Sequence, residues 1–273
     1  MSITQCVAIL FLTLAAGSCS DRRSVAPLAP SPVPQPAPQP VPTPNAGGVH
    51  GKVVDTADRP IVGAVVEVLD GAQAGMSATS GVTGEFMFAW PFDDTTLFRA
   101  TKEGYIAATQ SWKRGSPDHP WLMFYLGVPV PPVNLAGDYT VTFIADRACA
   151  AALPAELRTR AYAATITAVP PSSISQENTR YIIALSGAQF DPYYNWFSVA
   201  VAGDYLAFWL GDEHIIEQLA GNTHLEIGGA ASASVGTSPI STISASFDGV
   251  FDYQAVPHAR CESKNHQLNF TRR

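Results

Sequence analysis

The residues from Gly51 to Tyr105 limit the possible folds more than any other part of this chain. Short runs rich in β-branched and aromatic residues alternate there with glycine, proline and aspartate, and no run keeps a helical period. Seven candidate strands follow one another in this region: Val49–Asp55, Ile61–Leu69, Met76–Ser80, Glu85–Trp90, Thr95–Thr101, Tyr105–Trp112 and Trp121–Leu126. The pattern predicts a seven-stranded Greek-key β-sandwich over residues 48–127.

Several motifs in this region carry a family resemblance. They are an opening at Gly51, Val53 and Asp55, the run Pro60, Ile61, Gly63, Ala64, Val66 and Val68, the turn Thr79 to Phe86, and the closing pair Gly104 and Tyr105. This arrangement resembles the carboxypeptidase regulatory-like domain, a small sandwich related to transthyretin and to carbohydrate-binding-like folds. The resemblance implies an architecture and an exported address, and it implies no catalytic residue.

The start of the chain has the features of an export signal. Residues Cys6 to Ala16 form an apolar run that is too short to span a bilayer. The sequence Ala16-Gly17-Ser18-Cys19 then resembles a bacterial lipobox, in which the cysteine receives a lipid. A plain secretory signal cleaved at the same bond is the alternative. We expect residues 1–18 to be a signal peptide and Cys19 to be the lipidation site, which predicts a cell-envelope lipoprotein of the outer membrane, facing the periplasm or the cell surface, or else a secreted protein.

A proline-rich segment follows within residues 19–47. Every second residue from Pro30 to Pro44 is proline, which excludes both a helix and a β-ladder. Polyproline II geometry at about 3.1 Å per residue would extend these residues over roughly 45 Å. The composition therefore predicts a semi-rigid spacer between a membrane anchor and the first folded domain.

A second β-rich unit is expected over residues 134–273, after a proline-rich break at residues 128–132. Alternating apolar and polar residues predict eight strands: Gly137–Phe143, Ala161–Ala168, Arg180–Gln189, Trp196–Ala202, Tyr205–Leu210, Thr223–Ile227, Ile240–Phe247 and Gln267–Thr271. Eight strands in this length fit an antiparallel barrel or a second sandwich. The barrel alternative is loosely similar to lipocalins. The whole chain is therefore expected to be all-β.

The cysteines support an exported protein. Removal of Cys6 with the signal and lipidation of Cys19 leave only Cys149 and Cys261. An oxidising compartment favours a disulfide between these two residues, and two buried free thiols are the alternative.

Charge and motifs exclude several classes of function. The net charge is −7, and no block of lysine and arginine is present that would neutralise a nucleic-acid backbone. No phosphate loop, dinucleotide fingerprint, serine-hydrolase elbow or zinc-protease motif occurs. We therefore expect no enzymatic activity, no cofactor, no metal site and no nucleic-acid partner.

One aromatic-rich stretch, Phe190 to Phe197, is the candidate ligand site. Five aromatic residues lie within these eight positions, next to Pro192. Tyr193, Tyr194 and Trp196 would stack on a small ligand, and Asp191 and Asn195 would hydrogen-bond to hydroxyls. The alternative is a hairpin whose aromatic side chains cover one end of a barrel. The remaining tryptophans, Trp90, Trp112, Trp121 and Trp209, are expected in the cores.

Two functions from different classes fit these observations. The first is a non-enzymatic, membrane-anchored module that binds a glycan or an envelope protein. The second is an accessory subunit, or a degenerate domain, of an extracellular hydrolase or peptidase.

Overall fold

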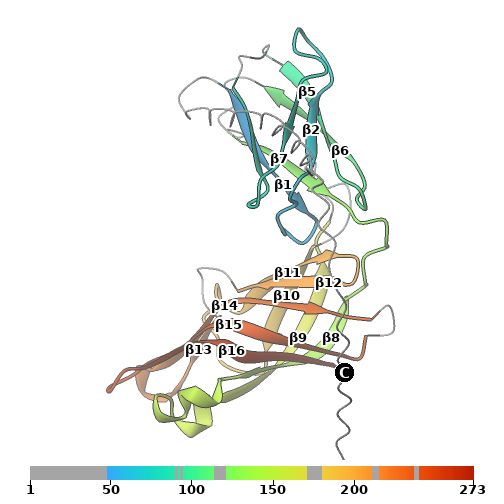
Figure 1. Ribbon diagram of the computed structural model, residues 1–273. Coiled ribbons are helices and arrows are strands. Elements are labelled where there is room, and N and C mark those ends of the chain that lie inside the picture. Colours follow the sequence, from blue (N-terminus) through green and yellow to red (C-terminus); the bar gives the residue numbers. More distant parts are fainter. Residues whose placement is uncertain are drawn as a thin grey trace, which may run out of the picture. The chain divides into compact units, whose positions relative to one another are not determined.

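The computed structural model describes residues 48–89, 92, 95–113, 121–170, 180–210, 215–236 and 240–273. The predicted signal peptide, the lipidation site Cys19, the proline-rich spacer and Trp90 lie outside the described residues. The regular structure of the described residues consists of β-strands and three short 3₁₀ turns (Figure 1). The expectation of an all-β chain is therefore confirmed.

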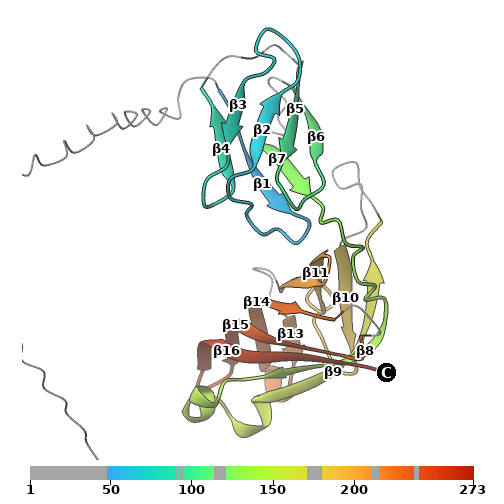
Figure 2. The same cartoon turned by 45° about the vertical axis from the view of Figure 1, so that its right-hand side comes forward.

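The first β domain is a sandwich of two sheets. One sheet has the order β4 (Glu85–Phe88), β1 (Val49–Asp55) and β7 (Leu122–Leu126). The other has the order β3 (Ser77–Thr79), β2 (Val65–Val68), β5 (Thr95–Thr101) and β6 (Ala108–Lys113). All pairs are antiparallel except β1 with β7. Figure 2 shows the two sheets facing each other.

Alternation explains which side chains fill the sandwich. In β4, Phe86 and Phe88 are buried while Glu85 is exposed, and in β5 Phe98 is buried between exposed or half-buried neighbours. These rings meet Phe124 of β7 in one apolar cluster. A period of two therefore places one face of each sheet in the core.

Two residues of the sequence motifs hold a tight turn of this domain. Asp55 is buried, and its carboxylate accepts hydrogen bonds from the backbone N–H of Ala57 and Arg59 at 2.8 and 3.0 Å. The Arg59 guanidinium pairs with the same carboxylate at 2.6 Å. Gly84 has a φ of +78°, and a Cβ atom there would lie 2.4 Å from the carbonyl oxygen of Val53. Only glycine therefore fits at this crossing of chains.

The second β domain is a closed antiparallel barrel. Its strands are β8 (Gly137–Ile144), β9 (Thr159–Ala168), β10 (Arg180–Ser186), β11 (Trp196–Ala202), β12 (Tyr205–Trp209), β13 (Ile215–Gln218), β14 (His224–Ser234), β15 (Thr242–Gln254) and β16 (Ala259–Arg272). They form one sheet in the order β12-β11-β10-β9-β8-β16-β15-β14-β13. An additional pairing of β12 with β14 closes eight of the strands into the barrel, and β13 stays outside this ring.

This result decides between the two architectures that the sequence left open. The domain is a barrel and not a second sandwich. The sequence did not predict β13, a four-residue strand. It also underestimated the lengths of β14, β15 and β16. Three short 3₁₀ turns connect strands in the described residues: η1 (Arg147–Ala151), η2 (Ala155–Leu157) and η3 (Ala220–Asn222).

Aromatic side chains pack the interior of the barrel. Phe143 of β8 contacts Tyr162, Phe197 and Phe247 at ring-centroid distances of about 6 Å. Phe270 of β16 stacks on Phe208 at 5.1 Å. These rings come from strands on every side of the barrel, so they form its core.

Candidate functional site

The predicted ligand loop is held in place by backbone pairing with β13. Asp191 N–H donates to the Ile216 carbonyl, and Ile216 N–H donates back to the Tyr194 carbonyl, both at 3.0 Å. The Asp191 carboxylate accepts from Tyr193 N–H at 3.1 Å, and the Asn195 amide donates to the Leu185 carbonyl at 3.3 Å. Both polar side chains therefore contribute to the shape of the loop.

The aromatic residues of this loop differ in exposure. Tyr193 is 77% exposed, Trp196 at the start of β11 is 44% exposed, and Tyr194 is half-buried. Phe190 contacts Tyr162 at 5.0 Å between ring centroids. Part of the loop thus covers the end of the barrel core, while Tyr193 and Trp196 face solvent. Their role in ligand binding stays a prediction.

Two tryptophans that were expected in the cores are exposed. Trp121 precedes β7 and is 45% exposed, and Trp209 at the end of β12 is 58% exposed. The neighbours of Trp209, Phe208 and Leu210, are both buried, so alternation turns the Trp209 side chain outward. The core assignment of these two tryptophans was wrong because it followed from the apolar character of tryptophan and did not consider which face of the strand each position occupies.

A groove lies on the outer face of the barrel around Trp209. The strands that carry its barrel lining are β10, β11, β12, β14, β15 and β16. Small side chains form much of this lining: Ser198, Ala207, Ala230, Ser232 and Ser246. Trp209, Asp248 and Lys264 are exposed large side chains of this lining, and the Arg180 side chain at its β10 edge is partly exposed.

Strand pairing fixes the arrangement of these side chains. Trp209 of β12 lies directly opposite Ala230 of β14, and Ala230 lies opposite Asp248 of β15. The next row of the same outer face consists of Ala207, Ser232 and Ser246. Residues two apart on a strand share a face, so both rows open to the same side of the sheet. Sequence reasoning missed this groove, although the alternation in Tyr205–Trp209 was a usable signal for an outward Trp209.

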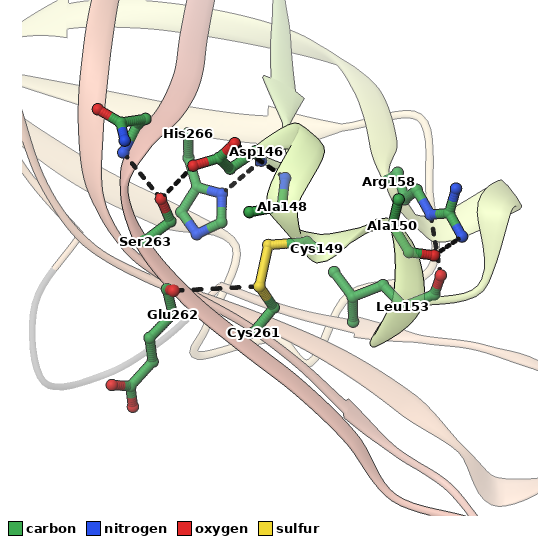
Figure 3. The surroundings of a disulfide bond; sticks show 11 residues. Asp146, Ala148, Cys149, Ala150, Leu153, Arg158, Cys261, Glu262, Ser263 and His266 are labelled. Atoms are coloured by element: carbon green, nitrogen blue, oxygen red, sulfur yellow. Dashed lines mark hydrogen bonds between the residues drawn. A yellow bond between two sulfur atoms is a disulfide. The ribbon is translucent and has the colours of Figure 1, made fainter.

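The predicted disulfide between Cys149 and Cys261 is present and joins η1 to β16 (Figure 3). Asp146 caps η1 by accepting from Ala148 N–H at 3.1 Å, and its carboxylate also accepts from the Ser263 hydroxyl. The hydrogen bond from Ser263 is the largest cause that lowers the pKa of Asp146. These contacts tie the first turn after β8 to the middle of β16.

His266 lies beside this disulfide and is fully buried. Its Nδ1 accepts a hydrogen bond from Asp146 N–H at 2.9 Å, and its ring lies 4.9 Å from Phe251. Burial is the main cause that lowers the pKa of His266, because it disfavours the charged ring. Ser263 donates to Asp146 and not to His266, so these three residues lack the serine–imidazole contact that a nucleophilic triad requires.

Two further properties concern metals and membranes. Among the residues that the structure describes, no three His, Cys, Asp or Glu side chains are grouped so that they could hold a metal ion. Within the same residues, no helix is long and apolar enough to cross a bilayer.

Comparisons with known proteins returned no match to a family model, a curated protein or a solved structure.

Proposed function

We propose that this protein is an exported, lipid-anchored binding module of the cell envelope. In this proposal Cys19 carries the lipid, the proline-rich segment is a spacer, and the sandwich with its resemblance to carboxypeptidase regulatory-like domains is a non-catalytic support. The barrel domain binds the ligand, a glycan or another envelope component, on its outer surface.

The groove around Trp209 is the observation that supports this function. Burying tryptophan is strongly favourable, yet Trp209 is more than half exposed on a strand whose other face packs the barrel core. Between Trp209 and Asp248 the outer face carries only the small side chain of Ala230, and the next row carries Ala207, Ser232 and Ser246, so a ligand can approach the backbone closely. The barrel interior is packed by the rings of the core, which supports a site on the outer surface of the barrel.

The anchor is tested with the Cys19→Ser variant of the full chain. A diacylated cysteine holds an otherwise polar protein on a membrane, so the variant is expected to move from the membrane fraction to the soluble fraction. Fractionation followed by immunodetection measures this, with the wild type as the control. A variant that stays with the membranes would contradict lipidation at Cys19.

The binding surface is tested with the detergent-solubilised full chain against separated glycan, lipid and protein fractions of bacterial envelopes. One fraction is expected to bind the wild type in biolayer interferometry, and Ala230→Leu is expected to abolish binding by filling the groove. Ala184→Leu, an exposed substitution on β10 outside the groove, is the matched control and should bind normally. Binding that survives Ala230→Leu, or the absence of binding by every fraction, would overturn the proposed surface.

A further inference from the structure

We propose that the groove recognises a neutral saccharide, with one sugar ring lying over Ala230 between Trp209 and Asp248. This inference rests on the proposed function, because it names the ligand class of the same outer surface. Of the residues in this groove, the sequence had singled out only Trp209, and had assigned it to the core.

The spacing of the strands sets the size of the gap. Trp209, Ala230 and Asp248 are consecutive partners across β12, β14 and β15. Neighbouring strands lie about 4.8 Å apart, so the backbones at Trp209 and Asp248 are about 10 Å apart. Ala230 fills the position between them with a single methyl group. This backbone spacing leaves room for one sugar ring to lie over Ala230.

The floor of the groove suits a flat and hydroxylated ligand. Ala207, Ser232 and Ser246 form the adjoining row, and Ser198 lies opposite Trp209 on β11. Alanine methyls allow close approach, and serine hydroxyls both donate and accept hydrogen bonds. A long apolar chain would leave these hydroxyls without partners, whereas a sugar would pair with them.

The large side chains around the floor offer three complementary contacts. The indole of Trp209 presents a flat, electron-rich face that attracts the slightly positive C–H groups of a sugar ring. The Asp248 carboxylate accepts hydrogen bonds from hydroxyl groups, and the Lys264 ammonium donates to hydroxyl or ring oxygens. Both charged side chains are exposed, and within the described part of the chain no ion pair engages either of them.

The two charges also argue for a neutral ligand. Asp248 and Lys264 line the same groove with opposite signs, and the two other charged residues of the lining, Arg180 and Asp58, form an ion pair with each other. Their fields largely cancel for a ligand that bears a net charge, whereas hydroxyl groups profit from an acceptor and a donor together. A phosphate, a uronate chain or a cationic peptide would meet one like charge in the groove.

The test is isothermal titration calorimetry of the detergent-solubilised full chain with oligosaccharides of glucose, mannose, galactose and N-acetylglucosamine. At least one series is expected to bind. Trp209→Ala should weaken that binding by about tenfold or more through loss of stacking, Trp209→Phe should retain part of it, and Asp248→Asn should weaken it. Trp121→Ala is the matched control, because this exposed tryptophan belongs to the sandwich domain and its loss should leave binding unchanged. Each variant is first shown to melt as the wild type does.

The outcomes separate this inference from the proposed function. If no saccharide binds while a lipid or protein fraction binds and Ala230→Leu abolishes that binding, the saccharide inference is overturned and the binding surface stands. If Tyr193→Ala removes saccharide binding and Trp209→Ala does not, the β10–β11 loop is the site and the groove is rejected. If nothing binds to the groove, both proposals fall.

Discussion

At the scale of single residues, the environment of His266 has a measurable consequence. The ring is buried against Phe247 and Phe251, and Asp146 N–H donates to its Nδ1. Burial is the main cause of its lowered pKa; Asp146, Asp248 and the backbone at Gly249 and Cys261 act in the opposite direction and offset it only in part. Protonation would therefore place an unfavourable charge in the barrel core.

We predict that the barrel loses stability in mildly acidic solution because of His266. The unfolded histidine has a pKa of about 6.5, above that of the folded state. The contribution of the neutral ring is therefore fully present above about pH 6.5 and is lost as the pH falls toward the folded-state pKa. Urea denaturation of the full chain between pH 7.5 and 5 measures this.

The His266→Phe variant provides the comparison, since it keeps a buried ring and removes the titration. Its stability should change less with pH over the same window, whatever its absolute stability. The pKa of Asp146 is also lowered, from a value of 3.8, so its effect belongs to more acidic solution. Equal slopes for wild type and variant would show that His266 is not the titrating group.

At the scale of elements, the short strand β13 is connected to β9 by a network of polar side chains. It has four residues, and its Glu217 is buried. The Glu217 carboxylate accepts hydrogen bonds from both the Arg160 guanidinium and the Tyr162 hydroxyl of β9, the latter at 2.9 Å. Burial and the neighbouring Glu217 charge raise the pKa of Tyr162, so its hydroxyl stays protonated and donates. This network connects β9 to β13, and β13 in turn pairs with the aromatic loop.

We predict that Glu217→Gln destabilises the protein by about 3 kcal/mol, because it leaves Arg160 partly buried without a countercharge. The double variant Arg160→Met/Glu217→Leu should lower the stability of the protein less, since it removes both charges. Urea denaturation of the wild type, the Glu217→Gln variant and the double variant measures these differences in stability.

The exposed pair Arg99 and Glu67 on the sandwich is the matched control. Both side chains are more than a third exposed, so Glu67→Gln should change stability by less than about 1 kcal/mol. A Glu217→Gln effect as small as that of Glu67→Gln would mean that the buried network contributes little to the barrel.

At the scale of the whole molecule, the described chain consists of a sandwich and a barrel with separate cores. Every buried member of the sandwich cluster lies between Val49 and Leu126, and every buried member of the barrel cluster lies between Val133 and Phe270. Each domain therefore has its own hydrophobic driving force for folding.

We predict that a polypeptide of residues 47–128 folds without the barrel. It should give a strand-type circular dichroism spectrum and a cooperative thermal transition. Phe124→Ala in the same polypeptide removes a fully buried ring and should lower its stability by about 3–5 kcal/mol. A polypeptide without a cooperative transition would show that the sandwich needs the rest of the chain.

Strand periodicity was the property that sequence alone could supply. Alternation and turn residues established an all-β chain and two β-rich units, and the count of cysteines indicated the pair Cys149 and Cys261. These inferences succeeded because a period of two and the position of turns are local properties of the chain. The same alternation, applied to Phe208, Trp209 and Leu210, would have predicted that the Trp209 side chain faces outward.

The tertiary structure decided what depends on pairing between distant strands. Closure into a barrel requires β12 to meet β14, and no local pattern distinguishes that pairing from the edge of a sandwich. The strand β13 has only four residues, which gave too little periodicity to be recognised, and its Glu217 pairs with Arg160 of β9, a contact that no local pattern reveals. The groove also has no signature in the sequence, because Trp209, Ala230 and Asp248 become neighbours only through the register of three strands.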